Sequence, residues 1–341
     1  MGTGAVGAWV GGCLAASGVP VHFVVRPARH TTLQAKGLTL TDLEGRQTRL
    51  PPEALQLHPH PPDGLKPSLA LLTVKSGDTQ GAAAALSAAL PAGTLVLSLQ
   101  NGVDNTRVAQ AAAPGLVVLP GMVPYNIAEL SPGHLHRGTS GQLVAQTHPD
   151  VIPWLPVFAQ ALLPLKLVPD MAPVQWGKLL VNLNNPINAL SGLPLREQLL
   201  DADLRRCFAA LIHEALQVLK AAQRTAAPVT GLKPDRLVRA LRLPTPVFRL
   251  LAQRMLRIDH QARSSMADDL RRGRVTEIDA LCGAVVALAH QHGLRAPMNE
   301  RVRELVRGWP HAPHPWTGRE LWQAMASSLQ PLRPPTSKPT P

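Results

Sequence analysis

The sequence has few aromatic residues and no long apolar run. Aromatic residues make up 3% of the 341 positions, and Tyr125 is the one tyrosine. Because domains that read nucleic-acid bases by stacking need aromatic platforms, this composition argues against that class. No apolar run approaches the ~20 residues that a membrane-spanning helix needs. We therefore expect neither a nucleic-acid-binding protein nor a membrane protein.

Cysteine is equally scarce. The three cysteines lie far apart and form no C-x-x-C motif, which argues against a disulfide framework or a zinc site. No basic segment followed by an apolar run opens the chain, so a signal peptide is not expected. These features predict reduced, buried thiols in a cytoplasmic protein.

Acidic residues are absent from the first 41 positions and fewer than basic ones overall. The chain carries 34 Lys and Arg against 22 Asp and Glu, a formal net charge of +12. Residues 1–165 are nearly neutral (9 against 8), and residues 166–341 carry the excess (25 against 14). A basic half can attract nucleic acid or small anions, but three aspartates interrupt the arginines between Arg254 and Arg274. The pattern favours a small anionic ligand.

Short apolar runs alternate with helical stretches of small residues through the first half of the chain. Near-continuous apolar runs are typical of parallel strands that are covered on both faces. The alternation predicts an α/β domain over residues 1–168, with a Rossmann-type doubly wound parallel sheet. Residues 133–147 and 163–168 resemble antiparallel additions at one edge. The expected strands are 19–25, 69–74, 94–99 and 116–119, and the expected helices are 5–16, 81–89 and 105–113.

The second half changes character after residues 164–173. Residues 169–330 show helical patterns without a convincing strand, which predicts an all-α domain. Residues 331–341 include five prolines and are expected to form a disordered tail. The expected helices are 197–222, 233–242, 247–257, 276–292 and 298–307.

A glycine-rich loop opens the chain with the pattern G-x-G-x-x-G, and an expected helix and strand follow it. The first glycine of such a loop allows a tight turn, and the second lets the backbone approach a pyrophosphate. The third lets the helix pack closely on its strand. We therefore expect a dinucleotide to bind Gly2, Thr3, Gly4, Ala5, Val6 and Gly7.

One part of this motif is not in the sequence. The glycine pattern normally follows an apolar strand of about five residues, whereas only Met1 precedes Gly2. That strand forms the centre of the sheet, and without it two neighbouring strands would lack a partner. We therefore expect that about five or six residues are missing from the front of the sequence.

The end of the expected strand over residues 19–25 predicts which dinucleotide binds. An Asp or Glu there usually holds the ribose 2′-hydroxyl of NAD, but this chain has Arg26, Arg29 and His30. A carboxylate would repel a 2′-phosphate, whereas a guanidinium group can bind one through two hydrogen bonds. We therefore predict NADPH/NADP+ as the cofactor, with Arg26 and Arg29 near the 2′-phosphate.

Five segments that follow the glycine loop in the chain form a pattern together, although none of them would identify a family alone. They are, in chain order, Val74-Lys75, Gln100-Asn101-Gly102, Trp176-Gly177-Lys178 with Asn182, Ser264-Ser265-Met266, and Thr276-Glu277-Ile278-Asp279. In this order they resemble the ketopantoate reductase (2-dehydropantoate 2-reductase) family over nearly the whole chain. The resemblance implies a Rossmann domain, a helical domain and an active site in the cleft between them.

The resemblance also implies an activity and roles for individual residues. The activity is NADPH-dependent reduction of 2-dehydropantoate, a small 2-oxoacid, to (R)-pantoate on the route to pantothenate and coenzyme A. Lys178 matches the general acid. Glu277 matches a glutamate that holds the substrate and is counted among both the catalytic and the cofactor-binding residues. Lys75 matches a lysine near the nicotinamide, and Asn101 matches an asparagine that contacts cofactor and substrate. Family members occur as monomers or homodimers.

The chemistry of Lys178 suits this role. Hydride that arrives at a ketone carbon places charge on the oxygen, so a donor that releases a proton lowers the barrier. Burial alone would lower the pKa of the lysine, and a nearby carboxylate would counter that effect. Lys178 and Asn182 are four residues apart and share one face of the helix expected over 177–190. The alternative is a surface lysine whose stem lies along apolar neighbours.

The resemblance assigns the substrate to Asn182 and Ser265, although Ser265 can also be read as the cap of a helix over 266–270. A second substrate asparagine normally lies eight residues after the lysine, but Pro186 occupies that position. We choose Asn185 for this role, and Asn184 and Asn188 remain alternatives.

The segment over residues 121–126 (GMVPYN) also does not map onto the family pattern. These departures leave room for a relative that reduces another 2-oxoacid. A catalytically silent dinucleotide-binding regulator is the alternative outside the enzymes.

Overall fold

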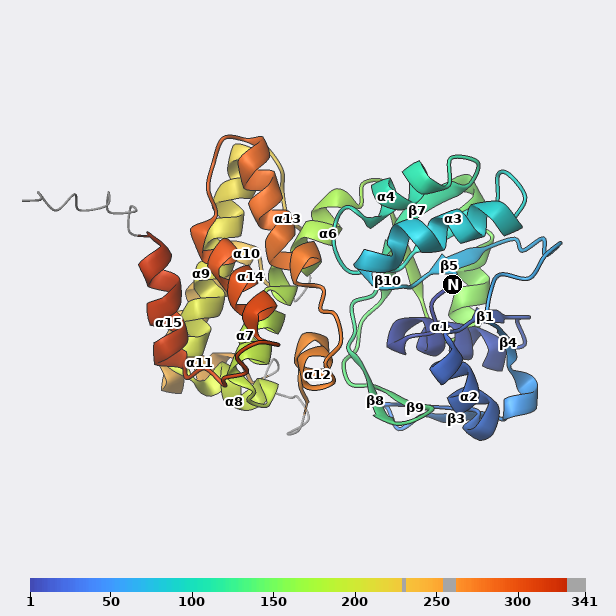
Figure 1. The fold of residues 1–341 in the computed structure, drawn as a ribbon, viewed down its shortest axis with the longest axis horizontal. Helices are drawn as coiled ribbons and strands as arrows, with labels where there is room; N and C mark the ends of the chain where they lie inside the picture. Colours follow the sequence, from blue (N-terminus) through green and yellow to red (C-terminus); the bar gives the residue numbers. More distant parts are fainter. Residues whose placement is uncertain (229–230, 254–261, 330–341) are drawn as a thin grey trace, which may run out of the picture. The chain divides into compact units, whose positions relative to one another are not determined.

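The computed structural model describes residues 1–228, 231–253 and 262–329 (Figure 1). Its contacts divide the chain into two compact units, Met1–Leu179 and Leu180–Pro341. The first is α/β and the second is helical, which confirms the predicted fold class. The division falls inside a helix, so the domain boundary expected at residue 168 stays a prediction. The expected tail over 331–341 lies outside the described residues.

The main sheet of the first unit contains β5 (Ala70–Leu72), β6 (Leu95–Ser98), β7 (Val117–Met122), β10 (Leu143–Gln146) and β11 (Leu165–Val168). Its order is β11-β10-β7-β6-β5. The neighbours among β5, β6 and β7 are parallel, β10 is antiparallel to β7, and β11 is parallel to β10. Both β10 and β11 therefore run opposite to β5, β6 and β7 at one edge of the sheet, as expected for residues 163–168 and for the β10 part of residues 133–147. A helical crossover joins β10 to β11, and such a connection brings the chain back in the same direction.

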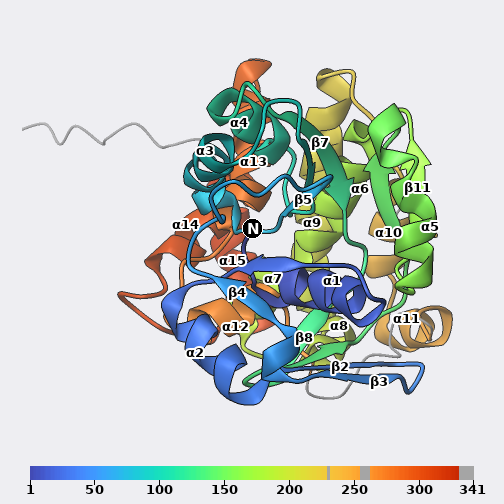
Figure 2. The ribbon, with the colours of Figure 1, turned by 90° about the vertical axis from the view of Figure 1, so that its right-hand side faces the viewer.

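Helices cover both faces of this sheet. They are α1 (Ala5–Ala16), α3 (Thr79–Ala89), α4 (Asn105–Ala112) and α5 (Trp154–Gln160), whereas α2 (Pro27–Lys36) packs against residues 56–58. On β6, Val96 joins the core beneath α3 and α4, whereas Leu95 and Leu97 join the core that contains α1 and α5. Successive strand residues point to opposite faces, so one continuous apolar run serves both cores. Figures 1 and 2 show α3 and α4 together, away from α1.

Two smaller sheets complete the first unit. One pairs β1 (His22–Val24) with β4 (Gln56–His58), and the other has the order β3 (Gln47–Leu50), β2 (Leu38–Asp42), β9 (His134–Arg137), β8 (Ile127–Ser131). Because β9 pairs in parallel with β2, residues 134–137 do not belong to the edge of the main sheet as expected. The strands β2, β3 and β4 and the helix α2 were not predicted from the sequence, since they are short and carry many polar residues.

The first residues lie between β1 and β5. The Gly2 N–H donates to the Val24 carbonyl at 3.3 Å. On the other side, the Met1 amino group donates to the Leu71 carbonyl at 2.7 Å, and the Thr73 N–H donates to the Met1 carbonyl at 2.9 Å. Met1 and Gly2 thus bridge the two strands at the place where the motif expects its central strand to end.

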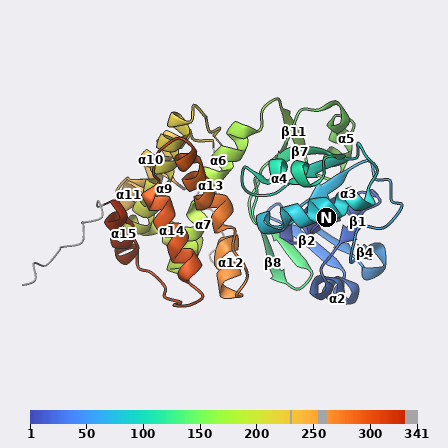
Figure 3. The ribbon, with the colours of Figure 1, turned by 45° about the horizontal axis from the view of Figure 1, so that its top comes forward.

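Within the described residues the second unit contains helices and no strand, as predicted. They are α7 (Asn184–Ser191), α8 (Leu195–Leu200), α9 (Ala202–Ala221), α10 (Pro234–Leu241), α11 (Thr245–Leu251), α12 (Ser265–Arg271), α13 (Ile278–Gln291), α14 (Pro297–Gly308) and α15 (Gly318–Ala326). The long helix α9 packs against α7, α8, α10, α13, α14 and α15 (Figure 3). Part of the helix expected over 247–257 falls outside the described residues. None of the described helices is long and apolar enough to span a bilayer.

Two helices that the sequence predicts as continuous are broken. Asp201 is extended between α8 and α9, and its carboxylate accepts from the Leu204 N–H at 2.8 Å, so it caps α9. α6 (Ala172–Asn182) ends where α7 begins. Pro186 explains this break, because it has no N–H to donate to the carbonyl of Asn182. Residues 197–222 and 177–190 therefore each form two helices.

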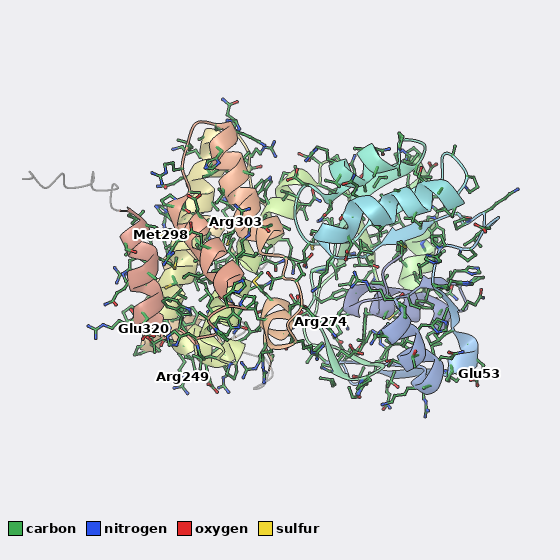
Figure 4. All side chains as sticks on the ribbon, in the orientation of Figure 1. Glu53, Arg249, Arg274, Met298, Arg303 and Glu320 are labelled. Atoms are coloured by element: carbon green, nitrogen blue, oxygen red, sulfur yellow. The ribbon has the colours of Figure 1, made fainter. Side chains whose placement is uncertain are left out.

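Charged groups join helices of the second unit. Arg303 of α14, labelled in Figure 4, donates to Asp279 of α13 at 2.6 Å, and Arg307 donates to the same carboxylate at 2.8 Å. The buried carboxylate of Glu214 on α9 accepts from the N–H groups of Met298 and Asn299 at 2.9 and 2.8 Å. Glu214 thus caps the N-terminus of α14 from a different helix, where the helix dipole favours a negative charge.

Candidate active site

The three glycines of the opening loop meet different steric demands. A Cβ on Gly2, whose φ is +95°, would lie 2.6 Å from Val74 Cγ1, and a Cβ on Gly7 would collide with the carbonyl oxygen of Gly2. A Cβ on Gly4 would meet no atom of the described residues within 4 Å. Gly2 and Gly7 therefore allow the loop to pack closely, while Gly4 leaves its outer side open for a ligand.

This loop leads into the N-terminus of α1. Gly4 is the N-cap and offers no side-chain hydrogen bond, and no acidic residue lies in the first turn. The first N–H groups of a helix lack intrahelical partners, and the helix dipole favours an anion beside them. Residues 2–7 therefore fit the phosphates of a dinucleotide.

Other predicted residues of the first unit lie at the carboxyl ends of neighbouring parallel strands. The Thr3 hydroxyl donates to the Val24 carbonyl at 2.9 Å, which ties the glycine loop to the end of β1. Lys75 follows β5, and Asn101 follows β6. The Ser76 hydroxyl joins these two segments by donating to the Asn101 carbonyl at 3.1 Å. The structure thus brings the glycine loop, Lys75 and Asn101 together where open α/β sheets bind their ligands.

A polar network that the sequence did not predict lies beneath these residues. Gln100 Nε2 donates to the Val74 carbonyl at 2.9 Å. Asn105 Nδ2 donates to the Ser76 hydroxyl at 3.1 Å and also to the Asn101 carbonyl. Both side chains are buried and connect the loop after β5 to the loop after β6. The sequence signal for this network was the run of polar residues directly after a buried strand. A buried amide without hydrogen-bond partners there would destabilise the fold.

The two arginines near the end of β1 differ in exposure. The Arg26 side chain is 77% exposed and pairs with Asp78 at 2.5 Å. The Arg29 side chain is 16% exposed and pairs with Glu129 of β8. An exposed ion pair contributes little to stability, so Arg26 can exchange its partner for a phosphate at small cost. Arg29 instead connects α2 to β8 and is less available.

Lys178 lies on α6 beside the segment that follows β7. Its Nζ donates to the carbonyl oxygen of Pro124 at 3.3 Å. Burial lowers the pKa of Lys178 from its usual 10.5 to about 8. An amine with a pKa near neutrality exchanges its proton readily, as a general acid requires, whereas a solvated surface lysine would keep its usual pKa.

The three candidate asparagines of α7 differ in their partners. Asn184 exchanges two hydrogen bonds with Gln198, at 3.1 and 2.9 Å. Asn188 is fully buried, donates to a backbone carbonyl at 2.9 Å and accepts from the Ser264 N–H at 2.8 Å. Asn185 is partly exposed, and its side-chain amide makes no hydrogen bond to the described residues. Asn185 is therefore the one of the three whose amide can accept a ligand without breaking an internal bond.

The remaining predicted residues belong to the second unit. Asn182 is the buried last residue of α6, and Glu277 is the N-cap of α13. Ser264 caps α12 by accepting from the Ala267 N–H at 3.2 Å. Ser265 is exposed at the first position of the same helix. The capping role that the sequence allowed for Ser265 is thus filled by its neighbour.

Family models match both parts of the chain. The model described as "Ketopantoate reductase PanE/ApbA" matches residues 1–150, and "Ketopantoate reductase PanE/ApbA C terminal" matches residues 170–309. Proteins named 2-dehydropantoate 2-reductase from Archaeoglobus fulgidus and Halobacterium salinarum are each 27% identical to the chain. Each alignment covers 90% of this chain and 96% of the relative.

Solved structures show the same relationship. The PanE/ApbA family ketopantoate reductase from Ralstonia eutropha JMP134 superimposes with a TM-score of 0.75 at 29% identity, covering 90% of this chain and 96% of that one. A D-mandelate dehydrogenase, solved with NADH and anilino(oxo)acetate, gives a TM-score of 0.72 at 19% identity over 90% and 96% of the chains. At that identity the similarity shows the fold alone.

Proposed function

Because the chain belongs to the ketopantoate reductase family, we propose that it reduces 2-dehydropantoate to (R)-pantoate with NADPH. This reaction would serve pantothenate and coenzyme A biosynthesis. The observation that carries the proposal is the lysine with a lowered pKa, Lys178, in the same unit as an open glycine loop. A silent regulator would need the loop but would have no use for such a lysine.

The residues of the chain divide the work of the proposed reaction. Residues 2–7, Arg26 and Lys75 hold the dinucleotide, which when bound supplies the hydride. Lys178 donates a proton from Nζ to the substrate oxygen as negative charge develops there. Asn101 contacts both cofactor and substrate. The substrate is held by Asn182, Asn185, Ser265 and Glu277.

The substrate is tested by following NADPH oxidation with a panel of 2-oxoacids. We expect the highest kcat/KM with ketopantoate. The other candidate is a relative that acts on another branched or hydroxylated 2-oxoacid, and the departure at residues 121–126 is the observation in its favour. A panel without preference for ketopantoate would replace the first candidate with the second.

The Arg26→Ala substitution tests the choice of cofactor. Loss of a charge-assisted hydrogen bond of about 1.5–3 kcal/mol should raise the KM for NADPH roughly 10- to 100-fold. The KM for NADH should stay unchanged, because NADH has no 2′-phosphate. Arg49→Ala, which removes another exposed arginine of the first unit, is the control. Equal turnover of the wild type with NADH and NADPH would contradict the assignment.

Substitutions at Asn185 and Asn188 separate substrate binding from stability. Asn185→Ala should raise the KM for ketopantoate by about tenfold, since the lost hydrogen bond is worth ~1–1.5 kcal/mol. Its melting temperature should stay near that of the wild type. Asn188→Ala should instead destabilise the fold by about 1–3 kcal/mol, because buried groups lose their partners. An unchanged KM in Asn185→Ala would remove this residue from the substrate site.

A further inference from the structure

The segment that departs from the family pattern is also the segment that contacts Lys178. Pro124 lies two residues beyond the end of β7, and its carbonyl oxygen accepts the hydrogen bond from Nζ. Within the described part of the chain, Nζ makes this hydrogen bond and no other. The position of the Pro124 carbonyl therefore decides where the amine is held.

The loop formed by residues 138–141 anchors the backbone next to this carbonyl. The Gly138 N–H donates to the Asn126 carbonyl at 3.0 Å, and the Asn126 N–H donates to the Thr139 hydroxyl at 2.8 Å. Tyr125, the residue after the acceptor, is 6% exposed and belongs to the core of the first unit. Two hydrogen bonds and one buried ring thus fix the segment on one side of Pro124.

Gly141 brings the same loop into contact with Pro124 itself. A Cβ on Gly141 would lie 2.5 Å from Pro124 Cγ and 2.9 Å from Pro124 Cβ. Carbon atoms do not approach so closely without displacement, so any side chain at this position would move Pro124 or the loop. A Cβ on Gly138 would meet no atom within 4 Å in the part of the chain that the structure describes. The loop is therefore tight at Gly141 and open at Gly138.

We propose that Gly141 is a positioning residue for Lys178, because it lets the loop close on Pro124 and so sets the carbonyl that orients the amine for proton donation. The inference rests on the proposed function, in which Lys178 is the general acid. An ammonium group has three N–H donors, and a single backbone acceptor leaves two of them for the substrate oxygen. A hydrogen bond to the charged form also favours retention of the proton until the substrate oxygen takes it.

Substitution of Gly141 by alanine tests this role through a pH profile. Displacement of Pro124 should weaken the hydrogen bond to the ammonium form and lower the pKa of Lys178 by about 1 unit, equivalent to ~1.4 kcal/mol. Since the proposed reduction needs the protonated amine, the alkaline limb of kcat should move to lower pH by the same amount. The KM for NADPH should not change. Gly138→Ala adds the same methyl group to the same loop in open space and should behave like the wild type.

Two further variants separate positioning from general damage to the fold. Pro124→Ala in the Gly141→Ala background removes the Cγ atom of the closest contact and should restore part of the shift. Thr139→Val removes the acceptor of the Asn126 N–H without adding a group beside Pro124, and it should lower the pKa of Lys178 in the same direction. Circular dichroism checks that each variant is folded.

NMR titration of protein labelled with ¹³C at lysine Cε measures the pKa of Lys178 without cofactor or substrate. The chain has eight lysines, and Lys178→Arg identifies the signal. A lower pKa in Gly141→Ala and Thr139→Val, with the wild-type pKa in Gly138→Ala, supports the proposal. Unchanged pKa values in the folded Gly141→Ala and Thr139→Val variants overturn it. A wild type that does not reduce ketopantoate overturns the proposed function instead, and the titration still reports on positioning.

Discussion

Replacement of Lys178 by alanine should lower kcat for ketopantoate reduction by about 10²–10⁴, the range that general acid catalysis contributes. The KM for NADPH should change little, because the residues proposed to bind the dinucleotide, the glycine loop and Arg26, lie elsewhere in the first unit. The measurement is steady-state NADPH oxidation at saturating ketopantoate, with dinucleotide affinity determined separately by fluorescence.

Lys178→Arg distinguishes proton donation from positive charge alone. Arginine keeps the charge, but its pKa is too high for it to release a proton at neutral pH. We therefore expect Lys178→Arg to be almost as slow as Lys178→Ala. Lys166→Ala removes an exposed lysine of the same unit and should retain full activity. If Lys178→Ala turns over at the wild-type rate, this lysine is not the acid.

Replacement of Arg205 by alanine should have the largest effect on stability, about 3–5 kcal/mol. Arg205 is fully buried at the junction of α8, α9 and α10. Its guanidinium group donates to three backbone carbonyls, and the Phe248 ring lies 4.4 Å from it. The carbonyls belong to Leu199 at 2.9 Å, Leu241 at 3.2 Å and Leu243 at 3.1 Å.

The cost has two parts. Truncation leaves buried carbonyl oxygens without donors, and each unsatisfied group costs about 1–3 kcal/mol. It also opens a cavity beside Phe248. Lysine at this position should fail as well, because one ammonium group cannot replace the planar fork of donors.

Urea unfolding followed by circular dichroism measures the effect of Arg205→Ala. Arg206→Ala is the matched control, because Arg206 is exposed and stacks 3.7 Å from the Trp322 ring. We expect the control to lose about 1 kcal/mol or less. Equal unfolding midpoints for the two variants would show that the buried arginine is not a main support of the helical unit.

The sequence predicted those parts of the fold that depend on continuous local patterns. The helix α1 has the predicted bounds, and the expected strands over 19–25, 69–74 and 94–99 contain β1, β5 and β6. The expected strand over 116–119 covers only the first half of β7, which continues to Met122. The short strands β2, β3 and β4 were missed, because three to five residues with alternating polarity carry little periodic signal. Their pairing depends on partners far away in the chain, such as β9 for β2.

The candidate site, like the fold, has a part that the sequence predicts and a part that depends on the folded structure. The glycine loop and Lys178 could be identified from the order of motifs. The sequence favoured Asn185 but could not exclude Asn184 and Asn188, because the partners of each amide depend on the fold. The break between α6 and α7 was foreseeable from Pro186 alone, because the missing N–H lies four residues after the last residue of α6.

The central claim is that Lys178 donates the proton in an NADPH-dependent reduction of ketopantoate. The pH profile of kcat at saturating NADPH and ketopantoate tests it most directly. A lysine must be protonated to act as an acid, and the pKa of Lys178 is about 8. We therefore predict a plateau below pH 8, a tenfold fall per pH unit above it, and loss of this limb in Lys178→Ala. A rate that stays constant or rises above pH 8, or a wild-type profile in Lys178→Ala, would contradict the claim.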